Sequence, residues 1–134
     1  MKFKYKKFLQ RDFSTTIRPI IPVTLSHGEK ALEHEVLIDS GADMCLFDAA
    51  IGEYLGLDVE SGEEAVLAGV TGGGELFYWH TVILRVGIRD LKTRVGFTRD
   101  IASSYGIAGQ KGFFDAFVVT FDYKKQEIEL KERK

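Results

Sequence analysis

The chain has 134 residues, 45% of them hydrophobic, and a formal net charge of −2. This length and apolar content predict one domain over residues 1–134, with residues 1–14 loosely ordered, and exclude a disordered chain. We expect no nucleic-acid partner, because there is no basic excess, and no membrane partner, because no apolar run is long enough to span a bilayer. Cys45 is the single cysteine. No internal disulfide can therefore form, and we expect a cytoplasmic location.

The first half of the sequence is typical of an all-β domain, because short apolar runs alternate with clusters of Gly, Asp and Ser. Residues 17–25 predict an edge strand, since Pro19 and Pro22 have no N–H to donate to a central ladder. Residues 26–30 predict a hairpin turn, and residues 31–39 predict the returning strand.

Beyond that hairpin, residues 48–57 have helical spacing of apolar side chains, with Asp48 as the expected N-cap and Gly56 near the end. Further strands are predicted where apolar runs lie between turn residues. These strands are residues 63–70, 75–86, 91–98, 117–122 and 126–130.

The most informative segment is the Asp-Ser-Gly-Ala sequence at residues 39–42. It directly follows the apolar run 36–38, and residues 44–47 return the chain to largely apolar sequence. Taken alone, an Asp-Ser-Gly triplet indicates only a turn in which the carboxylate accepts backbone hydrogen bonds. A carboxylate held between two apolar stretches is partly desolvated, however, and this setting favours a catalytic role for Asp39.

Residues 36–42 resemble the active-site loop of the retropepsins, the retroviral-type aspartic proteases, whose signature is two apolar residues, Asp, Ser or Thr, Gly and Ala. Residues 66–79 resemble the retropepsin flap, a hairpin with a Gly-rich tip that closes over an extended peptide. Residues 107–109, Ile-Ala-Gly, resemble the second family signature. The resemblance implies an all-β, retropepsin-like closed barrel or sandwich with a flap hairpin and one short helix.

The resemblance also implies roles for individual residues. Asp39 would be catalytic, and Ser40 and Gly41 would support the loop, Ser40 by bonding across a dimer. The active-site loop, the flap and the second signature would bind the peptide substrate through Gly41, Ala42, Asp43, Gly69, Val70, Thr71, Gly72, Gly73 and Ile107.

The sequence departs from the family pattern beside the second signature. Retropepsins often carry an Arg after the signature Gly, and it pairs with the acidic residue that follows the active-site Ala. Here that position is Gln110, followed by Lys111. Asp43 therefore either loses this partner or uses Lys111 or an Arg elsewhere.

Aspartic protease chemistry needs two carboxylates, and this chain has one such loop. Asp122 is also flanked by apolar residues, but Lys124 and Lys125 follow it, as in an exposed hairpin. A second copy of the chain would therefore supply the second Asp39 across a two-fold axis. The predicted activity is endopeptidase cleavage by an Asp-activated water in a homodimer, with no cofactor and no metal. By the resemblance, the chain ends would contribute to the dimer sheet, and here they are rich in Lys and Glu.

Three alternatives follow from the same residues. Cys45 could be a nucleophile with His34 or His80 as its base, although its neighbours Met44 and Leu46 are typical of a buried thiol. A metal site built from the histidines lacks close spacing of ligands. A non-catalytic peptide-binding or dimerisation module with the same fold would keep the cleft without turnover.

Overall fold

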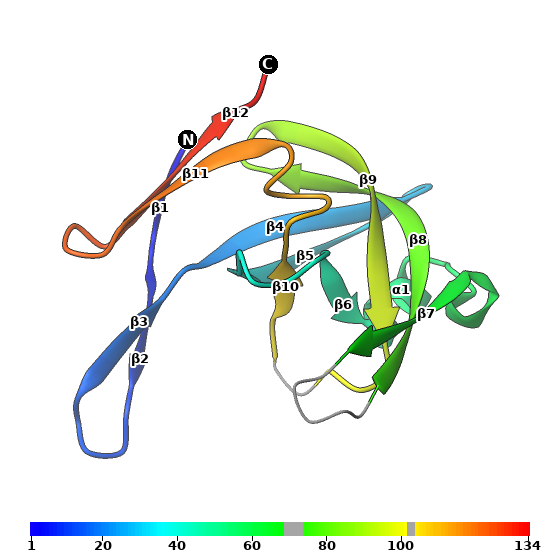
Figure 1. The fold of residues 1–134 in the computed structure, drawn as a ribbon, viewed down its shortest axis with the longest axis horizontal. Helices are drawn as coiled ribbons and strands as arrows, with labels where there is room; N and C mark the ends of the chain where they lie inside the picture. The colour runs from blue at the N-terminus through cyan, green and yellow to red at the C-terminus, as the bar shows by residue number, and fades with distance from the viewer. Residues whose placement is uncertain (69–73, 102–103) are drawn as a thin grey trace.

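The computed structural model describes residues 1–68, 74–101 and 104–134 of the chain. Within those ranges the protein is built mainly from β-strands, with one short α-helix and one 3₁₀ turn (Figure 1). No helix in these ranges is long and apolar enough to cross a membrane. The all-β prediction is therefore confirmed. The elements in chain order are β1 (Lys2–Lys4), β2 (Lys6–Leu9), β3 (Thr15–Arg18), β4 (Ile20–His27), β5 (Lys30–Ile38), β6 (Leu46–Asp48), α1 (Ala49–Tyr54), η1 (Val59–Ser61), β7 (Glu63–Ala68), β8 (Gly74–Val86), β9 (Arg89–Thr98), β10 (Gly106–Ala108), β11 (Phe117–Asp122) and β12 (Glu127–Glu132).

A seven-stranded sheet in the order β4-β5-β10-β6-β9-β8-β7 forms the body of the molecule. A further pairing of β4 with β8 folds this sheet back on itself. A fully closed barrel stays a prediction. Strands β1, β12 and β11 form a second sheet, and β2 with β3 forms a separate two-stranded hairpin (Figure 1).

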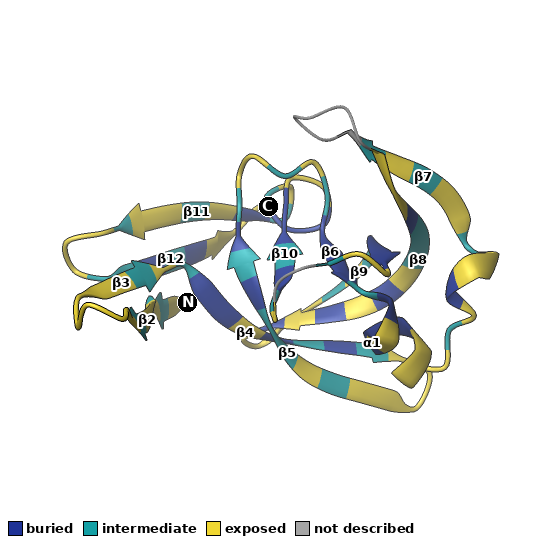
Figure 2. Ribbon diagram, turned by 90° about the horizontal axis from the view of Figure 1, so that it is seen from below, coloured by how far each residue is buried: buried dark blue, intermediate teal, exposed yellow. Residues whose placement is uncertain are grey.

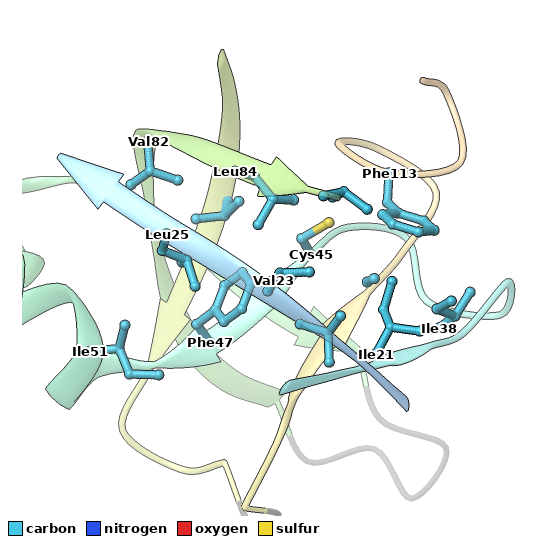
Figure 3. Packing of buried hydrophobic residues seen from close by; sticks show 14 of the residues in the cluster. Ile21, Val23, Leu25, Ile38, Cys45, Phe47, Ile51, Val82, Leu84 and Phe113 are labelled. Atoms are coloured by element: carbon cyan, nitrogen blue, oxygen red, sulfur yellow. The ribbon is translucent and has the colours of Figure 1, made fainter. Parts of the chain in front are cut away.

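The hydrophobic core lies inside the seven-stranded sheet, because apolar side chains alternate along its strands. On β4, Ile21, Val23 and Leu25 are buried, while Pro22 between them is exposed. Figure 3 shows these three side chains facing Phe47 of β6 and Leu84 of β8. Figure 2 shows buried residues along the strands of this sheet. This packing holds β5 in place, and the active-site loop follows β5 directly.

The predicted helix is confirmed, but it is shorter than expected. Its N-cap is Asp48, whose Oδ1 accepts the backbone N–H of Ala50 at 2.9 Å. The α-helix ends at Tyr54, and Gly56 beyond it has a φ of +86°, which stops the helical conformation. The helix buries Ile51 against the core.

The predicted edge strand is β4, and it has neighbours on both sides over part of its length. It pairs with β5 from Ile20 to His27 and with β8 only from Thr24 to Ser26. Pro22 lies outside the stretch paired with β8. Its missing N–H therefore removes no hydrogen bond to that strand.

The N-terminal residues, expected to be loosely ordered, contain strands β1 and β2. Strand β1 pairs with β12, and Met1 O accepts the N–H of Leu130 at 2.8 Å. Phe3 and Tyr5 pack against the core cluster. The sequence did not indicate this order, because the strand that pairs with β1 lies at the other end of the chain.

We expect Asp48→Ala to lower the free energy of unfolding by about 1 kcal/mol, because it removes the side-chain acceptor of the helix N-cap. Urea denaturation at neutral pH measures this loss. The matched control is Asp58→Ala, because Asp58 caps η1 without a side-chain hydrogen bond. Equal losses in the two variants would contradict the capping role.

Candidate active site

The active-site loop begins where β5 ends, and a parallel strand from a distant part of the chain sets its position. Strand β10 pairs with β5 in the register Ile38 with Ala108. One residue later, the N–H of Asp39 donates to the carbonyl oxygen of Ala108 at 3.0 Å. The second signature and the active-site loop are therefore adjacent, as the family resemblance implies.

The loop itself is a tight turn organised by Asp39. Oδ1 of Asp39 accepts the N–H of Gly41 at 2.9 Å, and its backbone carbonyl accepts the N–H of Ala42 at 3.2 Å. Asp39 is half-buried, while Ser40 and Gly41 are exposed. The turn thus orients one carboxylate oxygen and leaves the tip of the loop accessible to another molecule.

The second signature packs directly under the loop through Gly109. The backbone N–H of Gln110 donates to Ala42 O at 2.8 Å, and that of Lys111 donates to Asp43 O at 3.0 Å. A Cβ on Gly109 would lie 2.3 Å from Met44 O and 2.7 Å from Ala42 O. This approach leaves no room for a side chain, so glycine is required here.

The side chain of Gln110 takes a role that no pattern in the sequence indicates. Its Nε2 donates to the carbonyl oxygen of Ser40, in the Asp39 loop, at 2.9 Å. Among the described residues, no ion pair includes the Asp43 carboxylate, and Lys111 reaches Asp43 through the backbone alone. Gln110 therefore braces the loop by a neutral hydrogen bond.

The predicted flap is the β7–β8 hairpin, whose strands pair from Glu63 with Trp79 to Ala68 with Gly74. Its tip, with the predicted substrate contacts Gly69, Val70, Thr71, Gly72 and Gly73, lies outside the described residues.

The two faces of β8 differ as period-two alternation requires. Phe77 is buried and packs edge-on against Trp79, whereas Leu76 is exposed, as is its cross-strand neighbour Val66. The hydroxyl of Thr98 donates to Leu76 O at 2.9 Å and ties β8 to the end of β9. The hairpin thus exposes an apolar Val66–Leu76 pair.

The remaining peptide-binding predictions lie on the surface around the loop. Ala42 and Ile107 are half-buried, and Asp43 is exposed. Ile107 also pairs with Leu46 of β6, so it stands between the two strands that flank β10. The structure joins Ala42 and Asp43 to the second signature through Gln110 and Lys111. The contact of all three residues with a substrate stays a prediction.

The alternative chemistry at Cys45 is disfavoured by its surroundings. The thiol is buried, and this burial raises its pKa to about 11, so it stays protonated at neutral pH. His80 Nε2 instead lies 2.8 Å from Val59 O, and burial lowers the pKa of His34. Across the described parts of the chain, no three His, Cys, Asp or Glu side chains are grouped as metal ligands.

No protein-family model matches the chain, and no curated protein matches its sequence. Solved structures do match its fold. A retropepsin-like aspartic protease from Rickettsia conorii aligns with a TM-score of 0.61 at 14% identity, over 96% of this chain and 95% of that one. The EIAV protease, in complex with the inhibitor HBY-793, aligns with a TM-score of 0.53 at 24% identity, over 69% of this chain and 82% of that one. The chain therefore has a retropepsin-like fold, which confirms the resemblance at the level of the fold.

We expect Gly109→Ala to lower the free energy of unfolding by about 3 kcal/mol, because its Cβ would collide with two backbone oxygens that cannot move independently. Gly41→Ala is the matched control, since a Cβ there meets only the Asp39 carboxylate, at 3.2 Å. Urea denaturation of both variants measures the difference. A loss for Gly109→Ala no larger than that of Gly41→Ala would contradict the close approach.

We expect the folded protein to resist alkylation by iodoacetamide at neutral pH, because the buried Cys45 thiol is protonated and inaccessible. Mass spectrometry of the labelled protein measures the extent of reaction. The same protein in urea is the control and should react fully. Fast alkylation of the folded chain would support the alternative hypothesis that Cys45 is a nucleophile.

Proposed function

We propose that the chain is an aspartic endopeptidase whose active site forms across a homodimer, with one Asp39 from each subunit. The observation that carries the proposal is the position of Asp39: a half-buried carboxylate at the end of β5, braced by β10, in a retropepsin-like fold. The proposed protease domain comprises residues 1–134, and its proposed location is the cytoplasm, as expected from the single cysteine.

Two carboxylates held close together share a proton, because both cannot ionise easily. In the proposed site the ionised Asp39 accepts a proton from the attacking water. The protonated Asp39 of the second copy donates to the scissile carbonyl oxygen, where negative charge develops. The dyad titrates as a pair. In each subunit the N–H of Gly41 would steady one carboxylate oxygen during this exchange.

The other candidate carboxylate of the same chain is poorly placed to act as the partner of Asp39. Asp122, the other candidate, ends β11 on the separate three-stranded sheet. Its Oδ1 accepts the N–H of Lys125 at 3.0 Å, as in an ordinary hairpin turn. The site is therefore incomplete without a second copy.

The proposed substrate is an extended peptide. The exposed Gly41 and the half-buried Ala42 donate to Asp39 and so lie beside it, and Asp43 and Ile107 would extend this surface. The β7–β8 hairpin, as a flap, would exclude water and hold the peptide against this surface.

We expect the wild-type protein to cleave members of a diverse peptide library, most strongly at mildly acidic to neutral pH. We expect Asp39→Asn to abolish cleavage, because the amide cannot take up the water proton. Mass spectrometry of the library at several pH values measures both. Asp122→Asn is the matched control and should cleave as wild type does. A library left equally intact by wild type and Asp39→Asn would favour the non-catalytic peptide-binding or dimerisation module.

Subunit mixing tests the shared site with the same two proteins. When wild type and Asp39→Asn exchange subunits in equal amounts, only about a quarter of the dimers carry two Asp39 side chains. Activity per wild-type subunit should therefore fall to about half. Activity that is unchanged by mixing, in samples that light scattering shows to exchange, would contradict a dyad made from two copies.

A further inference from the structure

The β2–β3 hairpin, residues 6–18, stands apart from the two larger sheets. Within the part of the chain that the structure describes, its strands pair only with each other, from Lys6 with Arg18 to Leu9 with Thr15. Figures 1 and 2 both show it extending away from the seven-stranded sheet. An isolated two-stranded hairpin is marginally stable in water. We call residues 6–18 the arm.

One face of the arm is covered and the other is not. On the first face, the cations of Lys6 and Arg18 lie 5.7 and 5.9 Å from the ring centre of Phe8. On the second face, Leu9 is 70% exposed and Ile17 half-buried, and neither belongs to the core cluster as described. This face therefore carries Leu9 and Ile17 together with Lys7, which pairs with Ile17, and it does not pack against the core cluster as described.

The tip of the arm carries an aromatic residue in a costly conformation. Phe13 has a φ of +65° and is 85% exposed. A left-handed backbone is unfavourable for a bulky residue, and glycine or asparagine ordinarily fills such a turn position. The turn itself does not require an aromatic side chain at this exposed position, and an exposed aromatic ring is suited to anchor a partner.

The base of the arm adjoins the catalytic loop. The carbonyl oxygen of Pro19, one residue beyond the arm, accepts the N–H of Ile38 at 2.9 Å, and Asp39 follows directly. At the other strand of the arm, Lys6 forms an ion pair with Glu35 of β5. The arm therefore leaves the body of the molecule next to the loop that carries Asp39.

The charge distribution identifies a second copy as a suitable occupant. Residues 1–18 contain six of the chain's 18 basic side chains and one of its 20 acidic ones, so the rest of the chain contains 12 basic and 19 acidic side chains. The first segment thus has a net charge of +5 and the remainder −7. Among described residues, no ion pair includes Lys7 or Arg11. A basic arm and an acidic body attract one another between two copies.

We propose that the arm clasps the second subunit of the homodimer, with Phe13 as its anchor, so that each subunit holds the other at the shared site. This inference rests on the proposed function, because the two-fold axis beside Asp39 places the second copy within reach. It assigns the dimer a contact outside the active-site loops. The chain-end strand β1 pairs within its own subunit, with β12, in this structure.

Phe13→Gly tests the anchor without threatening the fold, since glycine relieves the positive φ while it removes the aromatic ring. We expect this variant to dimerise about tenfold or more weakly. At protein concentrations low enough for both proteins to be monomeric, it should unfold at the same or a higher urea concentration than wild type. Sedimentation equilibrium over a concentration series measures the dissociation constant. Charge reversal in Lys7→Glu/Arg11→Glu should also weaken the dimer and reduce its dependence on salt.

Two matched controls separate the anchor from general effects. Gln126→Gly relieves the other positive φ of a non-glycine residue, +58°, in a different hairpin. Ile88→Gly removes a side chain that is 88% exposed at the β8–β9 turn. Both should dimerise as wild type does.

The outcomes distinguish this inference from the proposed function. Dimers that form in Asp39→Asn but weaken with Phe13→Gly support the arm, even if no peptide is cleaved. Equal dimerisation of wild type and Phe13→Gly overturns the arm, even if Asp39→Asn abolishes cleavage, and a chain that stays monomeric at high concentration overturns both. Binding of wild type to phosphatidylserine vesicles that Phe13→Gly loses, with dimerisation unchanged, would instead assign the arm to a membrane surface.

Discussion

The parallel pairing of β5 with β10 is the contact on which the rest of the site depends. It joins two segments about 70 residues apart in sequence and places the backbone of Asp39 against that of Ala108. Because Gly109 has no side chain, the loop approaches the second signature closely enough for Gln110 and Lys111 to donate to its carbonyls. The carboxylate is thereby held on rigid strands, and this rigidity is what a preorganised catalytic group needs.

The core holds this pairing in place. Phe47 lies beneath β10, where a Cβ on Gly106 would come within 2.7 Å of its ring. The same ring packs against Phe97 of β9, so that β6, β9 and β10 share one apolar layer. Removing a side chain from this layer would act on the site through β10, because Ala108 of β10 accepts the backbone N–H of Asp39. The position of the carboxylate is thus a property of the whole sheet.

Two features of a single chain lack the partner that the proposals give them. Asp39 is one carboxylate where the proposed chemistry needs two, and the arm is a hairpin with one face uncovered. Both lie on the same part of the molecule, because the arm joins the body beside Ile38. A second subunit would complete both at once. The positive φ of Phe13 and the exposed tip of the Asp39 loop would then have a common explanation, because in the proposed dimer both face another chain.

Local patterns predicted much of the fold and the centre of the site. The Asp-Ser-Gly-Ala loop, the Asp48 cap and the terminal hairpin each depend on residues close together in sequence, where propensity and turn chemistry act directly. Strands β6 and β10 were not predicted, because each has three residues and is a strand only through its distant partners. The same reason hid the pairing of β1 with β12. The β2–β3 hairpin is local, but it was not predicted either.

By itself, the sequence determined the all-β class and singled out Asp39 as the candidate catalytic carboxylate, from which the prediction of a second copy follows, since these depend on residue types and their immediate neighbours. Only the tertiary structure decided how that carboxylate is supported. The Gln110 amide that bonds Ser40, the clash that reserves position 109 for glycine and the uncovered face of the arm all depend on segments brought together by folding. No local pattern reports such contacts, because their energies arise between residues that are remote in the chain.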